Sequence, residues 1–255
     1  MLILNVLFQK IQSIVFNILN LLFFKNRYCL VTSYFHPVTI SDSIHEKNIK
    51  LNFRQKKKIS IEICKAVRYL HSNKILHRAL STSKILLKDD HIKFSDYFLR
   101  IEPYLKKTKK MIEIFKEPYF IAPEVLKSID QFSEKSDIFS LGSIFWELFS
   151  GDKISKLKSK NLDSIADLIM QGRRPCDESK LQDLIKNNSD DKDIQMYLDL
   201  ILQCWNQNPD ERPSLDYIID SLRGVCSFFF LFFFYRILLL LLQQQIQKLN
   251  KLMHK

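Results

Sequence analysis

The stretch of residues 76–99 constrains the fold of this chain more than any other. It reads LHRALSTSKILLKDDHIKFSDYFL. Residues 85–88 and 92–95 favour β-strands, and the two aspartates between them indicate a turn. The sequence therefore predicts a short hairpin, preceded by a polar loop over residues 77–84 and followed by a second polar loop.

This arrangement resembles the catalytic loop and the metal-binding loop of eukaryotic protein kinases, whose patterns are H-R-D-L-x-x-x-x-N and D-F-G. Both motifs occur here at the family's spacing, joined by the expected hairpin. The resemblance implies an α+β, protein-kinase-like fold. It would have a mainly α-helical large lobe and an incomplete small-lobe β-sheet.

Several positions of these two loops depart from the family pattern. Ala79 stands where the family has its catalytic aspartate, and Lys84 stands where it has the asparagine that binds a second magnesium ion. Ser81 replaces the lysine or arginine that contacts the γ-phosphate in active relatives. The metal-binding aspartate remains as Asp96, but Phe98 replaces the glycine of D-F-G. The resemblance thus implies a kinase fold with no intact catalytic set.

The lysine at position 84 has two open interpretations. Its ammonium group could lie against Asp96 and satisfy that carboxylate without magnesium, or it could point to solvent. In either case no cofactor is expected, and ATP with magnesium would bind only if residual activity exists. Phosphoryl transfer needs positioning and charge neutralisation from several groups together.

Glycine is scarce, and the first of the four glycines is Gly142. A glycine-rich phosphate loop is therefore excluded from the N-terminal half, because such a loop needs backbone amides that approach phosphate with no side chain in the way. No acidic residue precedes Asp42. We therefore expect that the chain lacks the glutamate of the small-lobe helix, the first three strands and their lysine. Either the chain is truncated, or the nucleotide cleft lacks the strands that cover it.

Residues 1–24 are apolar and admit three interpretations. A signal peptide is unsupported, because the basic start and the small-residue cleavage site are missing. A transmembrane helix is disfavoured by polar side chains such as Lys10. The preferred interpretation follows from the resemblance: residues 17–22 look like the end of the small-lobe helix, and residues 28–35 look like the fifth strand and the hinge. The implied nucleotide pocket consists of Thr32 as gatekeeper, Tyr34 and Leu86.

The large lobe carries further motifs. Residues 54–72 have the apolar spacing of a helix, and residues 132–151 resemble the central helix of the lobe nearly residue for residue. Ser133 is the predicted N-cap of that helix and Gly151 its stop. The resemblance implies that Asp137 accepts hydrogen bonds from the backbone around His77 and Arg78. Such bonds would satisfy a buried aspartate, which is costly without them.

Residues 100–124 resemble the activation segment. Thr108 lies among lysines there and is either a phosphorylation site, which Arg78 could bind, or part of a solvated loop. Residues 118–126 resemble the A-P-E element that closes the segment. The pattern C-W-x-x-x-P-x-x-R-P-S at residues 204–214 is typical of tyrosine kinases and tyrosine-kinase-like kinases. It implies an ion pair between Arg212 and Glu124.

The resemblance divides the chain into three parts. Residues 1–35 are the remnant of the small lobe, with the end of helix C, strands 4 and 5 and the hinge. Residues 36–224 are the kinase large lobe, in which residues 161–171, 194–205 and 215–222 are expected helices. Residues 225–255 are a hydrophobic and then Gln/Lys-rich tail.

The apolar run from Phe228 to Leu242 could attach the chain to a membrane. As a helix, residues 225–242 would be ~27 Å long, which is just enough to span a bilayer. Arg236 would cost about 3 kcal/mol near the centre of the span. A mistranslated tail explains the run equally well.

Composition excludes some classes of function. The net charge of +11 comes with no arginine-rich helix and no interleaving of aromatic and basic residues, so no nucleic-acid partner is expected. The five cysteines form no C-x-x-C pair, which argues against a zinc site and a disulfide framework and fits a reducing compartment.

The residues that hold a kinase lobe together are kept here, whereas the chemical residues are lost. The kept residues are His77, Arg78, Tyr97, Glu124, Asp137 and Arg212. We therefore expect a catalytically inactive pseudokinase, cytoplasmic or membrane-associated, that acts as a signalling scaffold or allosteric binding module on other signalling proteins or kinases. The alternatives are an active ATP-dependent serine/threonine or tyrosine kinase seen in truncated form, and a membrane-anchored decoy.

Overall fold

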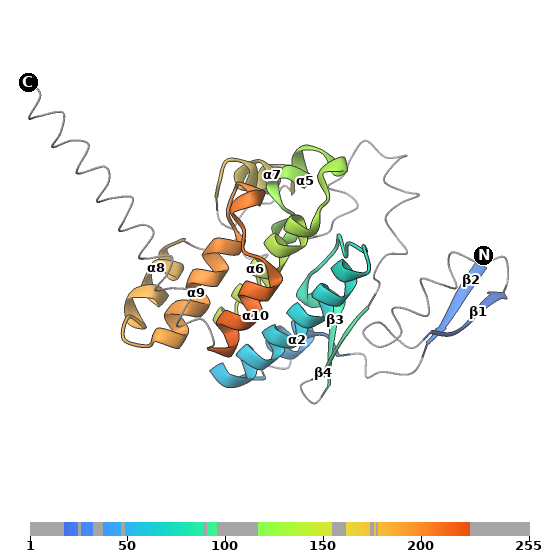
Figure 1. Cartoon of the computed structure of the whole chain (residues 1–255), viewed down its shortest axis with the longest axis horizontal. Helices are drawn as coiled ribbons and strands as arrows, with labels where there is room; N and C mark the ends of the chain where they lie inside the picture. Colours follow the sequence, from blue (N-terminus) through green and yellow to red (C-terminus); the bar gives the residue numbers. More distant parts are fainter. Residues whose placement is uncertain are drawn as a thin grey trace, which may run out of the picture.

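The computed structural model of the chain is mostly helical (Figure 1). It describes a set of ranges from residue 18 to residue 224. These are residues 18–24, 27–32, 38–46, 49–88, 91–95, 117–154, 162–173, 176 and 178–224.

The core is built around helix α6, Glu134–Ser150. Every residue of this helix from Ser136 to Leu148 is buried, as expected for a helix that is surrounded by others. It packs against α2, Phe53–Ser72, and against α9, Lys192–Cys204, while α10, Leu215–Arg223, packs on α2 and α9 (Figure 1). The predicted central helix is thus confirmed, with bounds a residue or two inside the predicted ones.

Capping residues define where these helices begin and end. At the start of α2, the Asn52 side chain accepts a hydrogen bond from Gln55 N–H and the Gln55 side chain accepts one from Asn52 N–H. At the end of α6, Gly151 has a φ of +71° and donates its N–H to the Glu147 carbonyl. Ser133 and Gly151 occupy the predicted cap positions of α6.

Gly142 allows α6 and α9 to approach each other. A Cβ atom at this position would lie 2.9 Å from Cys204 Cβ and 2.9 Å from Trp205 Cδ1. The Trp205 indole also donates a hydrogen bond to Ser143 Oγ at 3.1 Å. A side chain here would therefore push the two helices apart.

Two antiparallel hairpins accompany the helices in the described ranges. Strand β3, Ile85–Lys88, pairs with β4, His91–Phe94, in the register Ile85↔Phe94 and Lys88↔His91. This is the predicted hairpin, with the second strand shifted by one residue. Residues 38 and 39 run along the other edge of β3, where Leu87 N–H bonds to the Val38 carbonyl.

The second hairpin corrects a prediction. Residues 17–22 were expected to be the end of a helix, but the chain forms strand β1, Ile18–Phe24, paired with β2, Arg27–Thr32. Short apolar runs satisfy either structure, and the pairing with a second apolar run two residues away favours the strand.

The remaining elements are short helices at the edges of the core. They are α5 (Pro123–Lys127), α7 (Leu162–Met170), α8 (Glu178–Asn187), the π-helical turn η1 (Asp42–Glu46), and the 3₁₀ turns η2 (Thr82–Lys84), η3 (Pro118–Phe120), η4 (Ile129–Gln131) and η6 (Pro209–Glu211). Within the ranges listed above, none of the helices combines the length and the apolar character needed to cross a bilayer. The run from Phe228 to Leu242 lies outside those ranges.

Candidate functional site

Asp137 on α6 fixes the backbone of the loop over residues 77–84. Its side chain is 1% exposed. One carboxylate oxygen accepts the N–H of His77 at 2.9 Å, and the other accepts the N–H of Arg78 at 2.9 Å. His71 Nε2 lies 2.8 Å from the same carboxylate. The two backbone bonds are those that the sequence predicts, and the His71 contact adds a third.

His77 is buried against β4. Its ring packs edge-on against Phe94, with the ring centroids 4.8 Å apart. Burial lowers the pKa of His77 to about 4, even though the neighbouring Asp137 carboxylate acts in the opposite direction. The imidazole is therefore neutral at pH 7 and serves as part of the packed interior.

Arg78 has a backbone conformation that is rare for a residue with a side chain. Its φ is +64°, in the left-handed region. Its guanidinium lies over the Phe132 ring, 5.8 Å from the centroid. Because Asp137 holds its N–H, the loop keeps this turn, and the residue that follows is Ala79.

The three substituted positions lie together in this loop. Ala79 is half-buried and carries only a methyl group. Ser81 is buried, and its hydroxyl lies 2.8 Å from Ser83 Oγ. Lys84 ends η2, and its carbonyl accepts the backbone N–H of Ser95 at 2.8 Å. The positive charge of Lys84 is also among the groups that lower the pKa of His77, after burial.

Ser83 links the loop to the segment that leads into α5. Its hydroxyl donates a hydrogen bond to Glu117 Oε2 at 2.9 Å. Glu117 directly precedes η3, whose carbonyls at Tyr119 and Phe120 accept hydrogen bonds from Ser143 and Ser140 of α6. The loop and the end of the activation segment are thus connected to each other and to the core.

A second buried carboxylate, Glu147, holds the other end of the loop. It is 2% exposed and accepts the Thr82 hydroxyl at 2.5 Å and the Ile154 N–H at 2.7 Å. His45 Nε2 lies 3.6 Å from the same group. Two carboxylates on one helix, Asp137 and Glu147, therefore set the shape of the loop.

Arg212 and Glu124 form the ion pair that the sequence predicts. The guanidinium is fully buried and binds both carboxylate oxygens, at 2.6 and 2.7 Å. Further hydrogen bonds connect it to the carbonyls of Asn206 and Lys135. This bidentate pair ties α5 to the segment before α10.

The described part of the site does not fit the second magnesium ion of a kinase. Magnesium takes oxygen ligands, whereas the lysine at the ligand position has three donors and no acceptor. No group of three or more histidine, cysteine or acidic side chains is placed to hold a metal ion within the ranges that the structure describes. Asp96, the remaining candidate ligand, lies outside those ranges.

Other predicted site residues also lie partly or wholly outside the description. These are Tyr34, Tyr97 and Thr108, and only the backbone of Thr32 is described, as the last residue of β2. Leu86 is buried in β3. The proposed contact of Lys84 with Asp96, the nucleotide pocket and the phosphorylation site therefore stay predictions.

The sequence prediction missed the side-chain partners of the loop. Ser83 and Glu117 are 34 positions apart, and Thr82 and Glu147 are 65 apart. No local pattern marks such pairs, although a glutamate within the apolar run 144–149 could have singled out Glu147, since a buried carboxylate needs partners.

Comparisons with known proteins agree with this geometry. A family model described as protein tyrosine and serine/threonine kinase matches residues 4–222. The chain is 29% identical over 197 residues to a probable serine/threonine-protein kinase of Dictyostelium discoideum, which covers 77% of this chain and 20% of that protein. It is 31% identical over 203 residues to the probable serine/threonine-protein kinase gdt2 of the same organism, covering 76% of this chain and 11% of that protein.

A plant relative gives a similar result. The chain is 26% identical over 198 residues to the serine/threonine-protein kinase STY46 of Arabidopsis thaliana, which covers 77% of this chain and 32% of that protein. The chain thus spans between 11% and 32% of the length of these three relatives. With the family model matching most of its length, the chain belongs to the protein tyrosine and serine/threonine kinase family.

Proposed function

We propose that this chain is a pseudokinase, a kinase-family protein that does not transfer phosphate and acts as a scaffold or allosteric module for other signalling proteins. The observation that carries the proposal is Ala79. It follows a loop backbone that Asp137 holds in place, at the position where the family has its catalytic aspartate. A methyl group cannot accept the proton of an incoming hydroxyl group or orient it.

The charge at position 84 supports the same conclusion. An active kinase has an asparagine at this position, and its neutral amide oxygen binds magnesium. The lysine ammonium is itself positively charged and offers no lone pair to magnesium. An enzyme typically takes ~8 kcal/mol or more off the barrier of its reaction. Without the base and the second metal ligand, the described residues offer no source for a contribution of that size.

The preserved contacts support a role in binding. The Arg212–Glu124 pair, the bonds of Asp137 and those of Glu147 keep the large lobe folded without any part in chemistry. A lobe of this kind presents a stable surface to partner proteins. Partners are expected among signalling proteins or kinases rather than nucleic acids.

Two finer assignments complete the proposal. The pattern at residues 204–214 supports a place in the tyrosine-kinase-like group. The free cysteines Cys64, Cys176 and Cys204 suit a reducing compartment and support a cytoplasmic location. Membrane association through Phe228 to Leu242 stays a prediction.

The test is a phosphoryl-transfer assay on the full chain with ATP and magnesium, together with a nucleotide-binding titration. We expect no transfer above that of a chain-free control and no magnesium-dependent binding of ATP. The double variant Ala79→Asp/Lys84→Asn restores the family's residues, and Ala79→Asn/Lys84→Asn is its matched control without the carboxylate. If the restored variant gains magnesium-dependent transfer, the control should not. A gain in magnesium-dependent binding should appear in both variants, because both carry Lys84→Asn. Robust transfer by the unmodified chain would overturn the proposal and establish an active kinase.

A further inference from the structure

The structure contains a cavity of about 580 Å³ on the side of the lobe where α6 ends. Its walls come from η1, from the connection between η1 and α2, from the first turns of α2 and from the end of α6. The lining residues are Ile44, Ile49, Lys50, Leu51, Lys56, Leu148, Ser150 and Gly151. A cavity of this size lies within the range of about 300–1,000 Å³ that small-molecule sites occupy.

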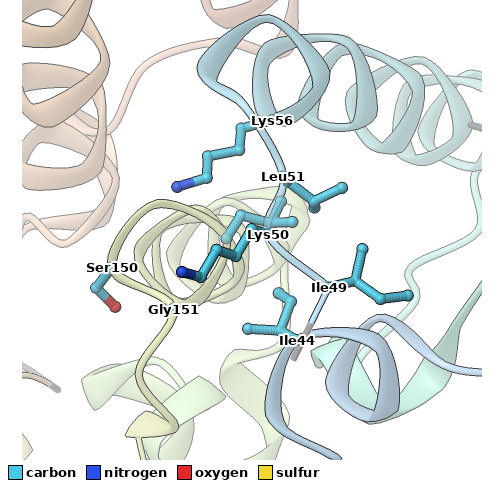
Figure 2. A pocket seen from close by; sticks show the side chains of 8 residues that line it. Ile44, Ile49, Lys50, Leu51, Lys56, Ser150 and Gly151 are labelled. Atoms are coloured by element: carbon cyan, nitrogen blue, oxygen red, sulfur yellow. The ribbon is translucent and has the colours of Figure 1, made fainter. Parts of the chain in front are cut away.

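The lining divides into an aliphatic part and a cationic part. Figure 2 shows the amine ends of Lys50 and Lys56 on the side of Ser150, and Ile44, Ile49 and Leu51 on the opposite side. The aliphatic part includes Ile49, which at 47% exposure is the most exposed large hydrophobic residue in the described ranges. Together with Ile44 and Leu51 it gives the cavity the apolar lining that is typical of small-molecule sites.

Lys56 is a partly buried cation at this site. Its ammonium donates one hydrogen bond to the Phe149 carbonyl at 2.8 Å and lies over the Phe149 ring, 5.4 Å from the centroid. Burial lowers its pKa from the ordinary value. An ammonium has three donors, and one of them is used by Phe149. A bound anion would accept from another and would offset the cost of burying this charge.

Lys50 adds a second cation from a different element. It is exposed, and it has no hydrogen bond or ion pair with any residue that the structure describes. Ser150 adds a hydroxyl, whose oxygen accepts the Asp152 N–H at 3.0 Å and leaves the O–H to donate. The nearby Asp152 carboxylate is itself paired with Lys180. The polar side of the cavity therefore offers donors to an anion.

We propose that this cavity binds an aliphatic carboxylate. The carboxylate would accept hydrogen bonds from Lys50 and Lys56, and the hydrocarbon chain would lie against Ile44, Ile49 and Leu51. Charge complementarity selects the anion, and the aliphatic walls select the apolar body. The site is independent of Ala79 and of the question of phosphate transfer.

Calorimetric titration of the full chain with decanoate, below its micelle-forming concentration, tests the proposal. We expect saturable binding of decanoate. Decanol, which lacks the carboxylate, and acetate, which lacks the hydrocarbon chain, should each bind much more weakly. Lys50→Ala and Ile49→Asn should each weaken decanoate binding about ten-fold, through loss of a charge-assisted bond or of apolar contact. Both side chains are exposed, so both variants should keep the far-ultraviolet circular dichroism of the parent chain.

Two matched substitutions control for general effects on the surface. Lys186→Ala removes an exposed lysine of α8, and Leu168→Asn removes a leucine of α7 that is 40% exposed. Neither residue lines the cavity. Both controls should bind decanoate within about two-fold of the parent chain. Absence of saturable binding, equal binding of decanol, or equal weakening by the control substitutions would each overturn the proposal.

Discussion

Ser83 donates a hydrogen bond to Glu117 across 2.9 Å and thereby connects the substituted catalytic loop to the end of the activation segment. Ser81 Oγ lies 2.8 Å from Ser83 Oγ, so Ser81, Ser83 and Glu117 form a chain of polar contacts. The substituted loop is consequently ordered by contacts within the protein itself.

Glu117→Ala should destabilise the protein by about 1 kcal/mol, because Ser83 loses a charged acceptor at a partly buried position. Urea denaturation measures the change, and Ser83→Ala completes a double-mutant cycle. The two single changes should not add, since each removes the same bond. Glu62→Ala, which breaks an exposed ion pair with Lys65, serves as the control and should cost less. Strict additivity in the cycle would show that the bond contributes nothing.

Asp137→Asn should cost about 3 kcal/mol of unfolding free energy. The amide keeps one oxygen and replaces the other by an NH2 group, so the backbone N–H of either His77 or Arg78 would face a donor and lose its acceptor. Asp193→Asn changes a carboxylate that is 62% exposed and should cost less than about 1 kcal/mol. Chemical denaturation of both variants gives the comparison, and equal losses would contradict the assigned role of Asp137.

The unfolding free energy of the protein should decrease as the pH is lowered, because His77 is protonated more readily in the unfolded chain. Burial lowers the pKa of His77 from its ordinary 6.5 to about 4 in the folded state. The unfolded chain therefore binds a proton below pH 6.5 while the folded chain does not. The contribution is complete above pH 6.5 and is lost as the pH falls toward 4, with a slope of up to about 1.4 kcal/mol per pH unit.

His77→Phe provides the test of this pH dependence. Phenylalanine keeps a ring against Phe94 but cannot bind a proton, so the unfolding free energy of the variant should change less between pH 6.5 and 4.5. Urea denaturation at several pH values measures both slopes. His91→Gln, at an exposed position on β4, should behave as the parent chain does. Parallel slopes for His77→Phe and the parent would refute the prediction.

Arg212→Lys should destabilise the protein by about 3 kcal/mol. Lysine cannot reproduce the two-pronged contact with Glu124 or the bond to the Asn206 carbonyl, so a carboxylate that is only 14% exposed would be left with a poorer partner. Thermal and chemical denaturation measure the loss. Arg223→Lys, at a side chain that is 46% exposed, should change the stability by less than about 0.5 kcal/mol. If both changes cost the same, the buried pair has no special role.

The large lobe could be predicted from sequence because its signals are local. Helix α6 carries Ser133 and Gly151 at its two ends, and the hairpin carries two β-prone runs around a turn. The two long-range contacts that were predicted, those of Asp137 and Arg212, came from family resemblance rather than from spacing. Motif and cap residues therefore account for most of the correct predictions about the large lobe.

The parts that were missed lack such signals or were ambiguous. Strand β1 is a short apolar run that satisfies a helix equally well, and only its pairing with β2 decides between them. Helix α8 was not predicted, although Leu181, Leu184 and Ile185 repeat at helical spacing. The bond of Ser83 to Glu117 depends on how distant segments pack, which no local pattern encodes.

Asp137 and Glu147 hold the loop through the backbone of His77 and Arg78 and through the Thr82 hydroxyl, so these bonds do not use the side chains at positions 79 and 84. An exchange at either position therefore leaves these bonds in place. Under our proposal, folding and chemistry depend on separate side chains of this loop. The double variant Ala79→Asp/Lys84→Asn therefore asks whether chemistry can be gained while the fold stays the same.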